Sequence, residues 1–178
     1  RGRMQKEPGT PLVELKHISK SFPGVKVLED ISVAFYPGKV HVLLGENGAG
    51  KSTIIKIISG IYHPDSGEVM IEGKAERFTN IRQSQKLGIS VIHQELSVIE
   101  DLMVYENVFL GREIRCNGIL DKKKMIAETK NLMSGIGIDI NPKAYIRELN
   151  NGEKQMVEII RAVSQSSRMV IMDEPTSS

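Results

Sequence analysis

The sequence contains a single cysteine, Cys116, among 178 residues. One cysteine cannot form a disulfide within the chain, and such scarcity is typical of a reducing compartment. None of the four histidines stands near another ligand at the spacing of a zinc site. The sequence therefore points away from a disulfide-stabilised secreted domain and from a zinc protein.

Strong charge of one sign and long apolar runs are also lacking. The net charge is +2, which gives no basic field of the kind that binds nucleic acid, so no nucleic-acid partner is expected. No apolar stretch approaches the length of a membrane-spanning helix. The remaining composition, 40% apolar and 26% charged, is typical of a globular domain large enough to form its own core.

Hydrophobic periodicity predicts strands in the first third of the chain. Residues 12–19 and 31–36 alternate apolar and polar side chains, as half-buried strands do. Pro-Gly pairs at 23–24 and 37–38 indicate turns. Residues 40–45 are nearly all apolar, which predicts a central parallel strand.

The pattern then changes twice. Residues 51–60 have helical spacing and end in a glycine, and a strand is predicted to end near Gln94. From about residue 100 helical periodicity dominates, until a short buried strand returns at 169–172. The sequence thus predicts an α/β core that is interrupted by a helical segment.

The stretch "GENGAGKST", residues 45–53, carries the most specific motif. Gly45, Gly50, Lys51 and Ser52 match G-x-x-x-x-G-K-[ST] between a predicted strand and a predicted helix, which is the context of a phosphate-binding loop. Glycines let backbone N–H groups surround an anion, and the helix N-terminus adds partial positive charge. The alternative is a glycine-rich turn before a helix.

The motif predicts individual roles. Lys51 would reach the β- and γ-phosphates of a nucleotide, and the Ser52 hydroxyl would bind Mg²⁺. The residues expected around the phosphates are Gly45, Glu46, Asn47, Gly48, Ala49, Gly50, Lys51, Ser52 and Thr53.

Two acids follow the last apolar run. Asp173 is expected at the carboxyl end of a buried strand, where it would hold Mg²⁺ through water. Glu174, one residue further on, is expected to point away from the Asp173 side chain and to polarise a water in line with the γ-phosphate. Taken alone, the pair would be solvated acids at a strand end; beside a phosphate loop, it predicts a hydrolytic site.

Together, "GENGAGKST" and "VIMDEPTSS" resemble the nucleotide-binding domain of ATP-binding cassette (ABC) ATPases. The resemblance implies a P-loop NTPase three-layer core with an antiparallel β edge and an inserted α-helical subdomain, about residues 100–164. It implies ATP and Mg²⁺ as ligands. Phe22 matches the family's adenine-stacking aromatic, and Gln94 matches the glutamine that touches Mg²⁺ and the attacking water. Glu174, Gln94 and Lys51 are then the expected catalytic residues.

The stretch "HQELSVIEDLMVYENVFLGRE" resembles more specifically the sequence of the first cassette of bacterial importers for ribose, galactose and related monosaccharides. That resemblance implies an ATPase at the cytoplasmic face of the membrane. Its partners would be permease subunits, a second nucleotide-binding domain and, indirectly, a periplasmic or extracellular sugar-binding protein.

The family's signature loop, usually Leu-Ser-Gly-Gly-Gln, departs from the pattern here. The matching residues are Leu149, Asn150, Asn151, Gly152 and Glu153. Asn150 lacks the serine hydroxyl but can donate a hydrogen bond and is a sound helix N-cap, with Glu153 in capping-box position. The departure therefore affects the strength of the contact that the family's serine makes with the γ-phosphate held by the opposite subunit.

Both ends of the chain carry an expectation. Residues 1–11 are a leader, either a cloning remnant ahead of Met4 or a natural terminus. Residues 12–178 form the nucleotide-binding domain, which the resemblance implies is incomplete because the family continues with a coupling loop, a histidine and a second cassette.

Two other classes share parts of the pattern. A non-transport ABC ATPase acting on ribosomes or DNA would have the same ATP motifs but different insertions between Gln94 and the signature loop. A small-molecule P-loop kinase would need an arginine-rich lid and an acceptor pocket, and would leave Gln94 and the signature loop as coincidences.

Overall fold

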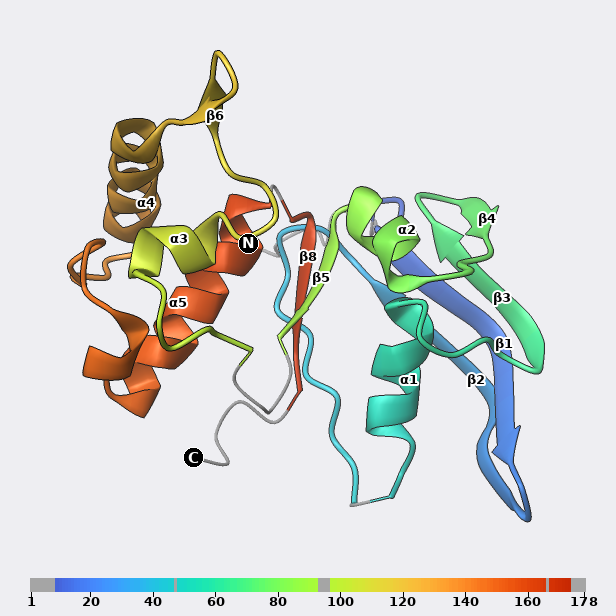
Figure 1. Cartoon of the computed structure of the whole chain (residues 1–178). Coiled ribbons are helices and arrows are strands. Elements are labelled where there is room, and N and C mark those ends of the chain that lie inside the picture. Colours follow the sequence, from blue (N-terminus) through green and yellow to red (C-terminus); the bar gives the residue numbers. More distant parts are fainter. Residues whose placement is uncertain (1–8, 47, 93–96, 166, 174–178) are drawn as a thin grey trace, which may run out of the picture. The chain divides into compact units, whose positions relative to one another are not determined.

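The structure is a computed structural model that describes residues 9–46, 48–92, 97–165 and 167–173. The chain divides into two compact units, residues 1–89 and 90–178. Each unit is described by itself below, with the labels of Figure 1.

The first unit is built on a four-stranded antiparallel sheet in the order β2-β1-β3-β4. Its strands are β1 (Val13–Phe22), β2 (Val25–Phe35), β3 (Ser66–Ile71) and β4 (Lys74–Glu76). Strand β1 lies between β2 and β3, so Val13 faces Phe35 on one side and Ile71 on the other. The predicted strands at 12–19 and 31–36 and the turn at 23–24 are confirmed.

Two helices belong to this unit (Figure 1). Helix α1 (Lys51–Ile58) buries four isoleucines, Ile54, Ile55, Ile57 and Ile58. The short helix α2 (Ile81–Lys86) is capped by Asn80, whose side chain accepts a hydrogen bond from the Gln83 N–H. Because these four side chains are withdrawn from water, burial of apolar surface holds this helix in the unit.

The predicted strand at residues 40–45 is wrong for the described structure. These residues form no strand, and Val40, Val42 and Leu44 are 93%, 70% and 88% exposed. Apolar composition suits a strand that is covered on both faces, but a strand also needs hydrogen-bonded neighbours. The described sheet of this unit, in the order β2-β1-β3-β4, supplies none to this segment.

The described part of the second unit combines two strand pairs with three α-helices and one 3-10 helix. Strand β5 (Ile89–Ile92), which starts at the boundary between the units, pairs with β8 (Met169–Met172). The remaining elements are α3 (Val104–Val108), the hairpin β6 (Arg115–Cys116) and β7 (Ile119–Leu120), α4 (Lys122–Gly135), the 3-10 helix η1 (Ile146–Glu148) and α5 (Asn151–Ser164). The predicted helical texture after residue 100 is confirmed.

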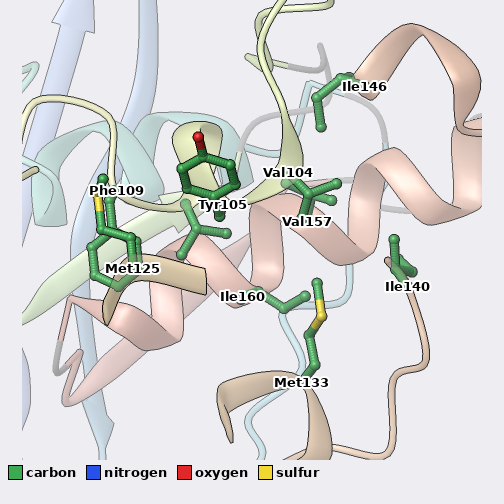
Figure 2. Close-up of a cluster of buried hydrophobic side chains, with 10 residues drawn as sticks. Val104, Tyr105, Phe109, Met125, Met133, Ile140, Ile146, Val157 and Ile160 are labelled. Carbon is green, nitrogen blue, oxygen red and sulfur yellow. The ribbon is translucent and has the colours of Figure 1, made fainter. Parts of the chain in front are cut away.

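Helices α3, α4 and α5 share one apolar core, shown in Figure 2. Its fully covered members include Val104, Val108, Ile146, Val157 and Ile160, which are all 0% exposed. Each such side chain stabilises the fold by roughly 1.5–3 kcal/mol when it leaves water. Within the described residues, no helix has the length and apolar character that crossing a bilayer requires.

Candidate functional site

The phosphate loop is shaped by two glycines with left-handed backbone. Gly48 has φ 86° and Gly50 has φ 84°, a region that side chains with a Cβ rarely occupy. Gly50 is also the N-cap of α1 and lies against β2: an added Cβ would be 2.5 Å from Cδ2 of Leu28 and 3.1 Å from the carbonyl oxygen of Val27. Position 50 therefore requires glycine for both conformation and space.

The first turn of α1 is left open for an anion. Among the described residues no side chain caps it, and its own sequence contains no acidic residue. Its first N–H groups carry the positive end of the helix dipole, and an unpaired helix N-terminus of this kind binds phosphate. The Ser52 side chain in this turn is exposed, so its hydroxyl is open to a ligand.

Lys51 lies across this loop. Its Nζ donates hydrogen bonds to the carbonyl oxygens of Gly45, at 2.7 Å, and Glu46, at 2.8 Å. The ammonium group thus sits among the residues expected around the phosphates. Both of these carbonyl groups are neutral, and an ammonium makes a stronger hydrogen bond with an anionic ligand than with a neutral carbonyl.

Phe22 ends β1 with its ring half-buried. The ring packs edge-on against Tyr62, with centroids 5.2 Å apart, and Lys20 Nζ lies 5.7 Å from its centroid. Lys56 Nζ in turn lies 5.3 Å from the Tyr62 ring. The stacking role of Phe22 stays a prediction. Its neighbour Tyr62, which lies between α1 and β3, was not singled out from the sequence.

Asp173 follows β8 directly, as predicted, and its N–H donates to the carbonyl oxygen of Ile92 at 3.1 Å. This hydrogen bond fixes the backbone of Asp173 at the end of the β5–β8 pair. Asn47, Gln94 and Glu174 lie outside the described residues.

The expected magnesium ligands are divided between the two units. Ser52 belongs to residues 1–89 and Asp173 to residues 90–178, so the structure does not bring them together within one unit. A hydroxyl and a carboxylate are oxygen donors that suit Mg²⁺. The donor chemistry fits the ion, and the shared site remains a prediction.

The signature loop forms the N-terminus of α5. The Asn150 side chain accepts a hydrogen bond from the Glu153 N–H at 2.9 Å, and the Glu153 carboxylate accepts one from the Asn150 N–H at 2.8 Å. The predicted capping box is confirmed. Because the cap uses the amide oxygen, the NH₂ group of Asn150 is the end that can donate to a ligand.

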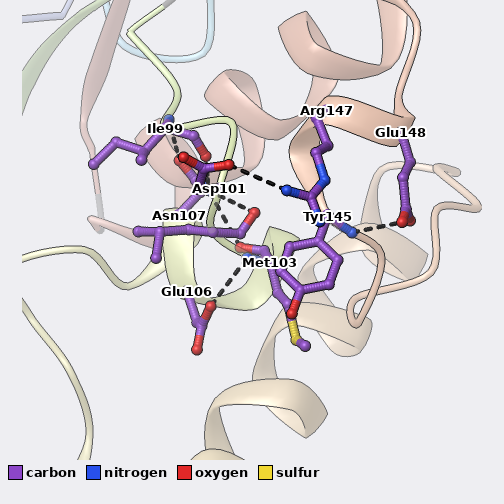
Figure 3. A network of polar contacts seen from close by, with 9 residues as sticks. Ile99, Asp101, Met103, Glu106, Asn107, Tyr145, Arg147 and Glu148 are labelled. Atoms are coloured by element: carbon purple, nitrogen blue, oxygen red, sulfur yellow. Dashed lines mark hydrogen bonds and ion pairs between the residues drawn. The ribbon is translucent and has the colours of Figure 1, made fainter.

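The segment from Ile99 to Asn107 is held by a polar network around the buried Asn107, which sequence reasoning missed (Figure 3). Asn107 is 0% exposed; its side chain accepts from the Ile99 N–H at 2.8 Å and donates to the Ile99 carbonyl oxygen at 3.0 Å. Nearby, Arg147 pairs with Asp101 at 3.2 Å and lies over the Tyr145 ring at 4.7 Å. In the sequence, the signal of this arrangement was Asn107, a polar residue within the mostly apolar stretch "VYENVF".

Electrostatics in this part of the second unit follow from burial and local hydrogen bonds. The Tyr105 hydroxyl donates to Glu106 at 3.0 Å. Burial first, and then this hydrogen bond, raises the pKa of the Tyr105 phenol to about 12. The Lys154 ammonium beside Glu100 lowers the pKa of that carboxyl from its usual value.

Comparison with known proteins identifies sequence relatives of this chain. The ribose import ATP-binding protein RbsA of Clostridium perfringens is 46% identical over 170 residues, 94% of this chain and 34% of the relative. The xylose import ATP-binding protein XylG of Geobacillus kaustophilus is 43% identical over 168 residues, 93% of this chain and 33% of the relative. The chain thus spans about a third of the length of these curated relatives.

Solved structures show the same fold. An ATP-binding cassette of an ABC transporter in its ADP conformation superposes with a TM-score of 0.81 at 26% identity, covering 94% of this chain and 70% of that one. The cbiO1 structure from Clostridium perfringens, part of the cbiONQ complex, gives a TM-score of 0.80 at 24% identity, covering 95% and 67%. The chain therefore has the P-loop NTPase fold of ABC ATPase domains.

The ABC transporter family model matches residues 28–177, which include the phosphate loop, the capping box of α5 and Asp173. The match covers most of the chain and agrees with the order of motifs along it. This chain belongs to the ABC transporter family.

Proposed function

We propose that this chain is the ATP-binding part of an importer subunit that couples ATP hydrolysis to uptake of a monosaccharide. Relatives that are 43–46% identical to it are named for import of ribose, xylose and galactose or methyl galactoside. Their similarity covers 93–94% of this chain. A common pentose or hexose is accordingly the proposed cargo class.

The geometry of the phosphate loop is the observation that carries the proposal. Left-handed glycines at 48 and 50 leave the first turn of α1 open, and Lys51 lies across the loop. On binding ATP, the ammonium of Lys51 exchanges its carbonyl contacts for oxygens of the β- and γ-phosphates. A charged partner makes a stronger hydrogen bond than a neutral carbonyl, which favours this exchange.

The remaining roles are proposed by position. Phe22 would stack on the adenine. Ser52, Gln94 and Asp173 would hold Mg²⁺, and the ion would supply charge neutralisation at the phosphates. Glu174 orients and polarises the attacking water. Catalysis by these residues consists of positioning and charge stabilisation rather than covalent chemistry.

Partners follow from the same proposal. A second cassette would supply its signature loop to the ATP bound here, and Asn150 would face the γ-phosphate of the other cassette. Permease subunits would carry the sugar, which places this chain at the cytoplasmic face of the membrane as a peripheral subunit.

ATP binding by the chain itself provides the first test. Calorimetry with MgATP is expected to show binding that Lys51→Ala weakens at least about tenfold, the order of one charge-assisted hydrogen bond or more. Lys74→Ala, which removes an exposed lysine of β4, is the matched control and is expected to bind as the parent does. Equal affinity in the parent and the Lys51 variant would overturn the site.

Transport is tested in the complete subunit, reconstituted with its permease in vesicles. We expect ATP hydrolysis to be stimulated by a sugar-loaded binding protein, and Glu174→Gln to abolish hydrolysis while sparing ATP binding. Stimulation by ribosomes or DNA, with none by any monosaccharide, would assign the chain to a non-transport ABC ATPase instead.

A further inference from the structure

The loop that follows α1 is attached to the last turn of that helix. Three donors converge on the carbonyl oxygen of Lys56: the Ser59 hydroxyl at 3.1 Å, the Ile61 N–H at 2.8 Å and the Tyr62 N–H at 3.0 Å. Because its N–H is one of the three, the backbone of Tyr62 has a fixed position relative to the end of α1.

The same loop is attached to β1 at Asp65, three residues later. The Asp65 N–H donates to the carbonyl oxygen of Ser19 at 2.9 Å. Its carboxylate accepts hydrogen bonds from Lys20 Nζ at 2.6 Å and from the Ser21 N–H at 2.7 Å. Phe22 is the next residue of β1, so the loop is bound to the strand directly beside this ring.

Between these two attachments the ring of Tyr62 meets the ring of Phe22. Their centroids lie 5.2 Å apart at an interplanar angle of 64°, which is the edge-to-face geometry that aromatic pairs favour. Tyr62 is half-buried and also lines a cavity of about 400 Å³, so its ring is packed on only part of its surface. Core packing alone does not account for an aromatic residue here, and the contact with Phe22 is the property to explain.

Tyr62 and Phe22 follow or end two elements that lead to different parts of the proposed ATP site. Helix α1 begins at Lys51 in the phosphate loop, and its eight residues span about 12 Å before the loop that carries Tyr62. Strand β1 ends at Phe22, the ring expected to stack on the adenine. All of these residues belong to the unit of residues 1–89. The contact therefore joins the helix expected at the phosphates to the ring expected at the base.

We infer that Tyr62 is a positioning residue that holds the Phe22 ring in one orientation relative to the phosphate loop. The protein then presents the stacking ring correctly before a nucleotide arrives. Without this contact the Phe22 ring samples several rotamers, and the apparent affinity for a nucleotide falls with the fraction of molecules in the competent one. The inference rests on the proposed function for the stacking role of Phe22, but not for the contact itself.

The contact is tested by NMR of the Phe22 ring protons in the chain without nucleotide. Tyr62→Leu removes an aromatic ring 5.2 Å away and is expected to shift these resonances, whereas Tyr62→Phe keeps the ring and is expected to leave them close to their parent positions. Tyr36→Leu is the matched control, because Tyr36 is also half-buried in this unit and packs on another ring, that of His41. Phe22 resonances that move equally in Tyr62→Leu and Tyr36→Leu would contradict the contact.

The positioning role is tested by calorimetry with MgATP and with inorganic triphosphate, which has no base. Tyr62→Leu is expected to weaken MgATP binding about three- to tenfold, the size of the effect of one aromatic pair, and to leave triphosphate affinity within about twofold. Tyr62→Phe and Tyr36→Leu are expected to bind both ligands as the parent does. Equal weakening of both ligands in Tyr62→Leu, or no weakening of either, would overturn the inference.

A double substitution shows whether Tyr62 acts through Phe22. In a chain that already carries Phe22→Leu, Tyr62→Leu is expected to cause no further loss of ATP affinity, and an additive loss would refute the positioning role. If Tyr62→Leu does not fold, Tyr62→Met replaces it with the same expectations, since the unbranched methionine side chain adapts to irregular space. Absence of ATP binding in the parent would refute the proposed function, whereas ATP binding that is unchanged in the Tyr62 variant would refute only this inference.

Discussion

The ammonium nitrogen of Lys51 lies 2.7 Å from the carbonyl oxygen of Gly45, six residues earlier in the same loop. The contact draws the lysine over the open first turn of α1, so the cation and the helix N-terminus face the same small region. Both favour an anion, and at Gly50 the packing against Leu28 and Val27 leaves no room for a Cβ. Substitutions at Gly50 and at Lys51 can therefore separate the effect of backbone shape from the effect of charge.

Replacement of Gly50 by alanine tests the backbone shape. The added Cβ meets Leu28 and Val27 at a position with φ 84°, so we expect Gly50→Ala to lower the free energy of unfolding by about 2–4 kcal/mol, from left-handed strain together with overpacking. Gly24→Ala is the matched control: its φ is 80°, but the added Cβ meets nothing within 4 Å. The control is expected to lose about 1–2 kcal/mol, from strain alone.

Urea unfolding of the two variants measures this difference. The close approach of Gly50 to β2 would be contradicted if both lost the same stability. We also expect Gly50→Ala to weaken ATP binding, since relief of the clash must displace either the loop or the Leu28 side chain.

How much of the molecule could be predicted from sequence depends on how local each feature is. The capping box of Asn150 and Glu153 and the turn before α1 were predictable because their partners lie within a few residues. The run at 40–45 misled because strand formation depends on neighbours that the run itself does not encode.

Non-local polar contacts set the other limit. Glu158 finds its partner 61 residues away in Ser97, and no periodicity marks that pairing. Tyr62 lies between α1 and β3 and packs on Phe22 at the end of β1. This contact can be foreseen only once it is known that β1 and β3 are neighbours in the sheet. Local chemistry was therefore readable from sequence, whereas the residues that support it were not.

Substitution of Asn150 tests the departure of the signature loop. Asn150→Ala removes the cap and is expected to cost about 1 kcal/mol in the free energy of unfolding, measured by urea denaturation. Asn150→Ser keeps an oxygen that can accept from the Glu153 N–H, so its stability is expected to stay close to that of the parent.

The serine variant also probes the contact across the dimer. In the complete subunit, Asn150→Ser restores the hydroxyl usual in the family, and we expect its ATPase rate to match or exceed the parent rate. A rate that falls to the level of Asn150→Ala would show that the asparagine amide makes a contact that serine cannot replace.

Removal of the Asn107 side-chain amide tests the network of Figure 3. Asn107→Leu leaves the N–H and carbonyl groups of Ile99 without their side-chain partners in a buried site, and we expect a loss of about 2–4 kcal/mol. Asn131→Leu, at an exposed position on α4, is the control and is expected to change stability by less than about 0.5 kcal/mol. Thermal unfolding that is equally affected in both variants would contradict the role of Asn107.

The last prediction concerns acid. The hydrogen bond from Lys20 and that from the Ser21 N–H lower the pKa of the Asp65 carboxyl from its usual value, because both favour the ionised form. A carboxyl with a lowered pKa in the folded state adds stability above its unfolded pKa, and that stability is lost as the pH falls through the folded value.

Carbon-detected NMR titration of the Asp65 carboxyl is expected to give a midpoint below that of an unfolded aspartate, about 3.9. Asp65→Asn keeps the shape but removes the charge, so its unfolding free energy should depend less on pH between about pH 5 and 2 than that of the parent. Asp139→Asn, outside this contact, is expected to leave that dependence unchanged. Lys20 contacts both the Asp65 carboxylate and the Phe22 ring, so Asp65→Asn should also release the lysine beside the expected adenine-stacking ring. A change in the affinity of this variant for ATP, without a change in its affinity for inorganic triphosphate, would place the effect at the base rather than at the phosphates.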